Sequence, residues 1–294
     1  MDVVLALLAA LFFAFGTVLQ QRGGLEQPSE GASSSLLLRM ARRPVWLAGI
    51  AADSLGFVAQ AVALAVGRLA VVQPLLVSTV VFALPLGARF TGQRIRRQDV
   101  AAAALVVGAL VAFLLIAEPS GGRDDAPLGQ WLVAFGACAL VCVPLCLLGR
   151  HGSPARRAAL LGTATGILFA LSAALTKVVA DQVGEGLFEI FLSWHLYALV
   201  VVGYASMTLN QLALNTGSLA PAVATSLAFD PITSVVLGVT LLDETLHATP
   251  IEGVGTALAL AAALVGMALL ARSQSQAQPA AVAEPELRPR AAVP

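Results

Sequence analysis

Charged residues are scarce in this sequence, and lysine is almost absent. Only 12% of the 294 residues are Asp, Glu, Lys or Arg, and Lys177 is the single lysine. Hydrophobic residues make up 58% of the chain, and the mean hydropathy is +0.86. This composition excludes an ordinary soluble domain and indicates an all-α protein that crosses a membrane many times.

The motifs of enzymes and ATP-driven pumps are also missing. No Gly-rich phosphate loop follows a strand pattern, no nucleophile–base–acid set is readable, and the three histidines lack metal-binding spacing. The cysteines Cys138, Cys142 and Cys146 recur at every fourth residue of one apolar stretch, which is typical of packing on a helix face. We therefore predict neither an enzyme nor a cofactor-binding protein, and nothing indicates a nucleic-acid partner.

Long apolar stretches fill the chain instead. Each is close to the ~20 residues that a helix needs to cross the hydrocarbon core of a bilayer. There are nine: 3–21, 45–66, 69–90, 100–117, 129–148, 158–180, 190–214, 219–242 and 253–271. Of the arginines up to Arg272, twelve then fall on one side of the membrane, and only Arg68 and Arg123 on the other. Because basic loops stay in the cytoplasm, we expect the plasma membrane, an external N-terminus and a cytoplasmic C-terminus.

An internal repeat divides the predicted transmembrane domain, residues 1–272, into two halves. Segment 59–70 reads AQAVALAVGRLA, and segment 209–220 reads LNQLALNTGSLA. The halves, about 3–117 and 157–271, hold four spans each and are joined by a linking helix at 129–148. Because a single span joins the halves, the second half enters the membrane from the opposite side to the first. This predicts an inverted repeat, as in many secondary transporters. We expect residues 273–294, rich in Ala, Gln and Pro, to be a disordered cytoplasmic tail.

Small residues and prolines mark particular helices of the repeat. Small residues recur at every fourth position of the sixth span, which predicts close approach by a neighbouring helix: Ala158, Gly162, Gly166, Ala170 and Ala174. Prolines interrupt the third span and its counterpart, the eighth: Pro74, Pro85, Pro221 and Pro231. Broken helices at matching positions of two halves indicate a central binding site, and tolerated kinks without a function are the alternative.

Polar side chains at membrane depth are the candidates for a binding site. Asp230 lies near the middle of the eighth span, and Asp53 lies about ten residues into the second. Carboxylates at such depth are costly, so each is a candidate for binding a cation or carrying a proton. Lys177, in the outer third of the sixth span, could bind an anionic group or extend to the membrane interface. Three amides could line a polar path or join helices: Gln60, Gln73 and Asn210.

Several segments, in their order along the chain, resemble the drug/metabolite transporter superfamily with its EamA-type repeats. They are FGTVLQQRGGL, VVQPLLVSTVVFALPLGARFTGQRI, LTKVVA and LNQLALNTGSLAPAVAT. Within that superfamily the chain looks most like the NIPA-type magnesium transporters, which also have nine predicted spans. This sequence departs from the superfamily pattern at Gln93, near the point at the end of the third helix where the superfamily often has an acidic residue. The resemblance implies a secondary transporter working by alternating access, with Mg²⁺ or another divalent cation as substrate. Asp53 and Asp230 would be its carboxylate ligands, and Gln60 and Asn210 would add amide oxygens.

Two other functions stay open from the sequence. One is a proton-coupled exporter of small metabolites or drugs, in which an acidic residue carries the proton and Lys177 binds an anionic group. The other is a non-transporting scaffold or lipid-handling protein, which would lack a polar cavity at mid-depth. Each has the lipid bilayer as its partner, and the sequence leaves open whether two copies form a homodimer.

Overall fold

The computed structural model describes residues 1–25, 43–92, 95–183, 186–246 and 250–277. Within these ranges, nine helical spans are long and apolar enough to cross a membrane, which confirms the predicted multi-pass membrane protein. The last helix continues to Ala277, beyond residue 271 where the hydropathy predicts its end. The remainder of the predicted tail, from residue 278 onward, lies outside the described residues.

The described helices fall before, at and after the helix predicted to link the two halves. The first half contains α1 (Asp2–Leu25), α3 (Pro44–Val66), α4 (Leu69–Leu76), α5 (Ser78–Thr91) and α6 (Arg97–Ala117). The helix predicted to link the halves is α7 (Leu128–Leu148). The second half contains α8 (Pro154–Val183), α9 (Leu187–Leu192), α10 (Trp194–Leu214), α11 (Leu219–Leu241) and α12 (Pro250–Ala277). The predicted seventh span therefore divides at Ser193, whose hydroxyl caps α10 by accepting a hydrogen bond from the His195 N–H.

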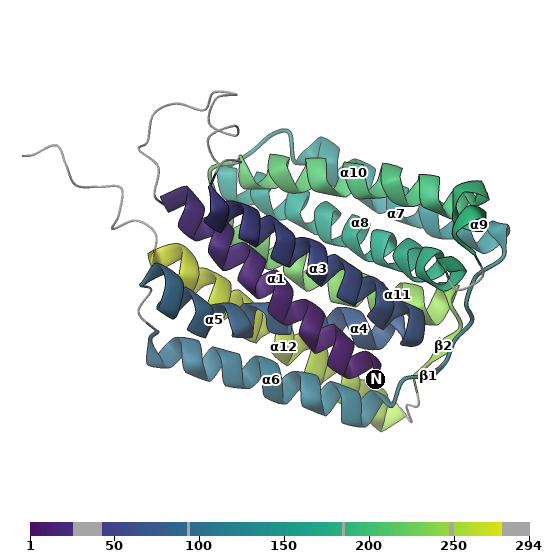
Figure 1. Ribbon diagram of the computed structural model, residues 1–294, viewed down its shortest axis with the longest axis horizontal. Coiled ribbons are helices and arrows are strands. Elements are labelled where there is room, and N and C mark those ends of the chain that lie inside the picture. The colour runs from purple at the N-terminus through teal and green to yellow at the C-terminus, as the bar shows by residue number, and fades with distance from the viewer. Residues whose placement is uncertain (26–42, 93–94, 184–185, 247–249, 278–294) are drawn as a thin grey trace, which may run out of the picture.

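Two short strands mark one end of the helix bundle. β1 (Ser120–Gly121) pairs antiparallel with β2 (Glu244–Thr245), so the connection between α6 and α7 meets the segment that follows α11. We call this end, which also contains Met1, the strand end (Figure 1). The opposite end, where α5 finishes and α6 and α8 begin, is called the arginine end, because Arg89, Arg97 and Arg156 lie there.

Similar helix contacts occur in the two predicted halves. In the first half α1 packs against α3 and α5, and in the second half α8 packs against α10 and α11. The fourth and ninth spans, α6 and α12, pack against each other along one side of the bundle (Figure 1). The halves also meet where α3 contacts α8 and where α4 contacts α11. The middle of the bundle is therefore bounded by helices of both halves.

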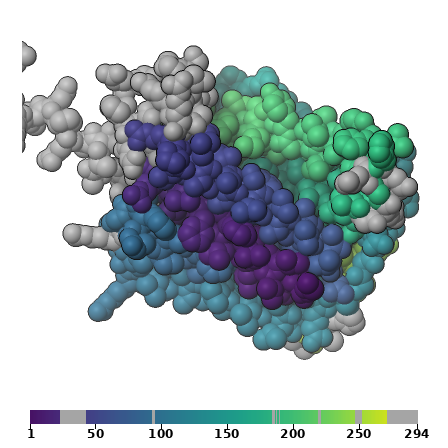
Figure 2. Space-filling view, in the orientation of Figure 1, coloured from purple at the N-terminus to yellow at the C-terminus, as the bar shows by residue number. Residues whose placement is uncertain are grey.

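Large apolar side chains cover the outside of the bundle, as expected for helices that face lipid. On α10 they include Tyr197, Val200 and Tyr204, and on α7 they include Leu132 and Leu140, all of them exposed. A contiguous apolar surface of this kind marks contact with a membrane rather than with water. Figure 2 shows the face of the bundle on which α1 and α3 lie side by side.

Small residues bring α8 and α11 into close contact, which confirms the prediction from the stripe in the sixth span. A Cβ added at Gly162 would collide with the Ala222 carbonyl oxygen and the Thr225 hydroxyl. A Cβ added at Gly166 would lie 3.0 Å from the backbone nitrogen of Asp230. Since glycine alone leaves room for this approach, the stripe fixes how deeply Asp230 is set in the bundle.

The proline-containing spans differ from each other. The third span breaks between α4 and α5 at Val77, whose N–H bonds to the Pro74 carbonyl oxygen at 3.2 Å. The eighth span, by contrast, is one continuous helix with Pro231 inside it, and Pro221 lies in its first turn. A proline in a first turn costs little, because the N–H groups there lack helical partners in any case. Pro85 lies inside α5 without ending that helix.

Candidate functional site

A cavity of about 460 Å³ lies in the middle of the bundle, between the two halves. Its wall is built from α1, α3, α4 and α5 of the first half and from α8 and α11 of the second. Three of the six polar residues singled out from the sequence line it, namely Gln60, Gln73 and Asp230, together with Pro231. The fold therefore brings a carboxylate from one half and two amides from the other to the same space.

Asp230 enters this cavity from the middle of α11. Its Oδ1 accepts a hydrogen bond of 3.3 Å from the Ser234 hydroxyl, one turn further along the helix. Close packing at Gly166 fixes the backbone of α11 at this point. The carboxylate is thus held by a rigid helix crossing and keeps acceptor capacity beyond its one bond to Ser234.

Two buried polar atoms in the cavity wall lack a hydrogen-bond partner among the described residues. They are the Nε2 donor of Gln73 on α4 and the Oγ of Ser172 on α8. Buried polar groups in proteins are almost always paired, so these two atoms are free to bind water, an ion or a solute in the cavity. The break after α4 shapes this part of the wall, since Leu76, Val77 and Thr79 beside it also line the cavity.

Aromatic and hydroxyl side chains complete the lining. The aromatic ones are Phe13, Phe57 and Phe169, and the hydroxyls are Thr17, Thr79, Ser172, Thr176 and Ser226. Sequence reasoning missed these hydroxyls because Ser and Thr in membrane helices usually bond to the backbone of their own helix. Thr176 does so here, donating to the Ser172 carbonyl oxygen at 2.8 Å.

Asp53 and Asn210 do not line the cavity. The Asp53 Oδ2 accepts a hydrogen bond of 2.5 Å from the Gln20 amide, and its side chain packs against Gly16, so it joins α3 to α1. Asn210 lies half-buried on α10. The two carboxylates expected to share a metal ion therefore lie in different surroundings, and within the described residues no group of three or more His, Cys, Asp or Glu could hold a metal.

Comparison with known proteins identifies one relative along nearly the whole chain. A Corynebacterium glutamicum protein, described as uncharacterized, is 32% identical over 275 residues, which cover 93% of this chain and 95% of the relative. The chain belongs to that protein's family. No model of a known protein family matches the chain, and no solved structure matches it.

Lys177 lies at the strand end of this protein rather than in the cavity. It is buried, and its Nζ donates to the carbonyl oxygens of Leu64 at 3.0 Å and Gly67 at 2.9 Å. Asp181, one turn along α8, lies 3.8 Å from the same nitrogen. Lys177 thus binds the carbonyl end of α3 in the first half, which the sequence does not indicate.

Glu244, which follows α11 in β2, is the other buried charged residue at the strand end. Its two carboxylate oxygens accept hydrogen bonds from the N–H groups of Leu69 at 2.6 Å and Ala70 at 2.8 Å. Burial raises the pKa of the Glu244 carboxyl above its usual value, and the two N–H groups and the charges of Lys177 and Arg68 offset part of that rise. The sequence contains one indication that α4 needs an acceptor from elsewhere. The residue before α4 is Arg68, whose side chain has no acceptor atom and cannot cap the helix.

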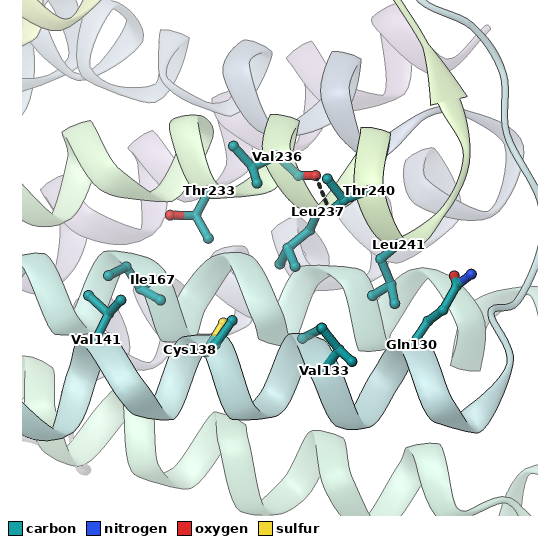
Figure 3. Close-up of a pocket in the computed structure, with 12 residues that line it drawn as sticks. Gln130, Val133, Cys138, Val141, Ile167, Thr233, Val236, Leu237, Thr240 and Leu241 are labelled. Carbon is teal, nitrogen blue, oxygen red and sulfur yellow. Dashed lines mark hydrogen bonds between the residues drawn. The ribbon is translucent and has the colours of Figure 1, made fainter.

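A second, larger cavity of about 560 Å³ lies on the side of the bundle, between α7, α8 and α11 (Figure 3). Apolar side chains such as Val133, Val141 and Leu237 dominate its wall. Its polar groups are few, and the Thr240 hydroxyl is already bonded to the Val236 carbonyl oxygen at 2.7 Å. The central cavity has a carboxylate and two amides in its wall and is therefore the stronger candidate for a solute site.

Proposed function

We propose that the protein is a secondary transporter of the drug/metabolite type, which moves a small solute through the central cavity by alternating access. The observation that carries this proposal is a cavity at mid-depth whose wall contains a carboxylate and two buried polar atoms that have no hydrogen-bond partner among the described residues. A membrane scaffold has no use for such a costly arrangement. The sequence contains no ATPase motif, so an ion or solute gradient would supply the energy.

The arrangement of the halves supports alternating access. Both halves repeat the same helix contacts, and each contains a tight hairpin, α3–α4 in one and α10–α11 in the other. The cavity lies where the halves meet, so rocking of one half against the other would expose it to either end in turn. The arginine distribution supports a cytoplasmic arginine end and an external strand end.

The cavity wall favours a small organic solute with a positive charge. Asp230 offers one carboxylate, and Phe13, Phe57 and Phe169 offer aromatic rings in the same wall. Carboxylates attract ammonium groups, and aromatic faces stabilise organic cations. Gln60 and Gln73 add amide groups that can orient a polar substituent.

Mg²⁺ is the second candidate, because the same wall offers oxygen ligands. Mg²⁺ keeps several waters and needs only one or two carboxylates from the protein, so Asp230 with amide and hydroxyl oxygens could bind it. Asp53 is not available to this site, since it lines no part of the cavity. The family resemblance seen in the sequence supports this candidate, whereas the phenylalanines favour the organic cation.

Flux measurements on purified protein in liposomes test the proposal. A panel of small organic cations and Mg²⁺ would be supplied as candidate solutes under defined proton and membrane-potential gradients. We expect Asp230→Asn to reduce the flux of the true substrate to background. Thr233→Val is the matched control, because Thr233 lies on the same helix but lines the lateral cavity. Wild-type flux in Asp230→Asn would overturn the assignment of the cavity.

Thermal melting separates the two substrate classes. A ligand that binds only the folded state stabilises it by RT ln(1 + [L]/Kd), about 2.7 kcal/mol at ~100 times Kd. If Mg²⁺ is the substrate, it should raise the melting temperature of the wild type more than that of Asp230→Asn, while Asp53→Asn should respond like the wild type. If the solute is an organic cation, Mg²⁺ should affect all three proteins equally, as a general salt effect.

A further inference from the structure

The turn between α3 and α4 depends on the other half of the protein. Only Gly67 and Arg68 separate the two antiparallel helices, and the Arg68 side chain makes no capping hydrogen bond to α4. The Arg68 carbonyl oxygen accepts from the N–H groups of Val71 and Val72. The turn supplies no such partner for the first two N–H groups of α4 or for the carbonyl oxygens at the end of α3. These groups carry opposite partial charges, negative at the end of α3 and positive at the start of α4.

Two ionisable side chains of the second half match these partial charges. Lys177 of α8 donates to carbonyl oxygens at the end of α3, at 2.9 and 3.0 Å. Glu244 of β2 accepts from two N–H groups at the start of α4, at 2.6 and 2.8 Å. Lys177 is 7% exposed and Glu244 is 1% exposed, so water competes little for either. Each sign of charge lies at the helix end that it stabilises.

The same helices form the cavity wall. Gln73 and Leu76 of α4 line the cavity one turn and two turns beyond the N–H groups that bind Glu244. Thr176, next to Lys177 on α8, lines it as well. A small pocket of about 190 Å³ at the strand end reaches Lys177 and Glu244 from the other side. The four hydrogen bonds therefore lie between the surface of the strand end and the central cavity, across the contact of the two halves.

We propose that Lys177 and Glu244 form a latch that holds the central cavity closed at the strand end. This inference rests on the proposed transport function, because it assumes that the halves separate to admit a solute. Opening toward the strand end moves the α3–α4 turn away from α8 and β2 and breaks all four hydrogen bonds. Lys177 and Glu244 are thus positioning residues that set how often the cavity opens.

Cysteine labelling measures this opening without measuring transport. Ser172→Cys would report from the cavity, in a protein whose Cys138, Cys142 and Cys146 are replaced by Ala. A membrane-impermeant maleimide would be added to intact cells and to inside-out vesicles, and Asp124→Cys, exposed at the strand end, would show which preparation presents that end.

The latch predicts a one-sided change in labelling. Glu244→Ala and Lys177→Met should raise the labelling rate from the strand end by roughly tenfold or more, since each loses two charge-assisted hydrogen bonds. Asp243→Asn is the control, because it removes a neighbouring carboxylate that pairs with Arg123 and not with α4. The control should label like the parent protein.

Glu244→Gln keeps the test decisive if the alanine variant does not fold. It preserves shape but leaves one acceptor oxygen for two N–H groups, so its labelling should rise by a smaller factor. Labelling of Glu244→Gln and Lys177→Met at the parent rate would overturn the latch, even in a protein that transports normally. Faster labelling in a protein that transports none of the tested solutes would support the latch and count against the transport proposal.

Discussion

Gly166 offers a sharp test of the packing that holds Asp230 in the central cavity. A Cβ at this position would lie 2.5 Å from the Ser226 carbonyl oxygen, 3.0 Å from the Asp230 nitrogen and 3.1 Å from the Phe229 Cβ. All three atoms belong to α11 at or next to its backbone, so no flexible side chain can move aside. Gly166→Ala must therefore push α8 and α11 apart.

Two opposing effects set the change in the free energy of unfolding of Gly166→Ala. Alanine favours a helix over glycine by about 1 kcal/mol, whereas forcing an extra carbon into a packed contact typically costs about 1–3 kcal/mol. We expect the contact to dominate and the free energy of unfolding to fall by about 1–2 kcal/mol. Gly136→Ala on α7 is the matched control, because a Cβ there has nothing within 4 Å. That variant should gain up to about 1 kcal/mol.

Unfolding of both variants by SDS in mixed micelles, followed by circular dichroism, measures the difference. Solute flux in liposomes should also fall in Gly166→Ala, because the shifted α11 carries Asp230 away from Ser172 and Gln73. The reasoning is refuted if Gly166→Ala proves as stable as Gly136→Ala, since α8 and α11 would then not be in the tight contact described above.

Two further predictions concern the strand end and the topology. Burial raises the pKa of Glu244 in the native state, so the native state binds the Glu244 proton more tightly than the unfolded chain does. This contribution to stability is lost as the pH rises above 4.5 through the raised pKa. Glu244→Gln cannot titrate, so the melting temperature of this variant should depend less on pH in that range; an unchanged pH dependence would contradict the assignment. For the topology, Asp124→Cys should react with an impermeant maleimide in intact cells and Arg97→Cys should not, and the reverse result would invert the proposed orientation.

Features with a local physical cause could be predicted from the sequence. The nine spans follow from hydropathy, and the contact of α8 with α11 follows from small residues at every fourth position, of which Gly162 and Gly166 are the tightest. Gln60, Gln73 and Asp230 were singled out because polar groups are costly at membrane depth, and all three line the cavity. The role of these residues in transport remains a prediction.

Features that depend on distant contacts could not be predicted. Lys177 has the right depth for several roles, and its actual partners are carbonyl oxygens more than a hundred residues away, at Leu64 and Gly67. The two proline-containing spans also look alike in sequence, yet the third breaks at Val77 while α11 stays continuous across Pro231. Glycines of α8 pack tightly against α11 throughout this region, and that tertiary contact favours an unbroken helix.

Hydrogen-bond partners distinguish the deep carboxylates from one another. Asp53 accepts from Gln20 and packs on α1, and Glu244 uses both oxygens on two backbone N–H groups of α4. Asp230 accepts one weak side-chain hydrogen bond within the described residues, from Ser234 at 3.3 Å, and faces a cavity. A carboxylate offers about four acceptor positions, so Asp230 has the most capacity left for a ligand. Burial without sufficient partners is costly, and it is tolerated in a membrane helix where a bound cation can relieve the cost.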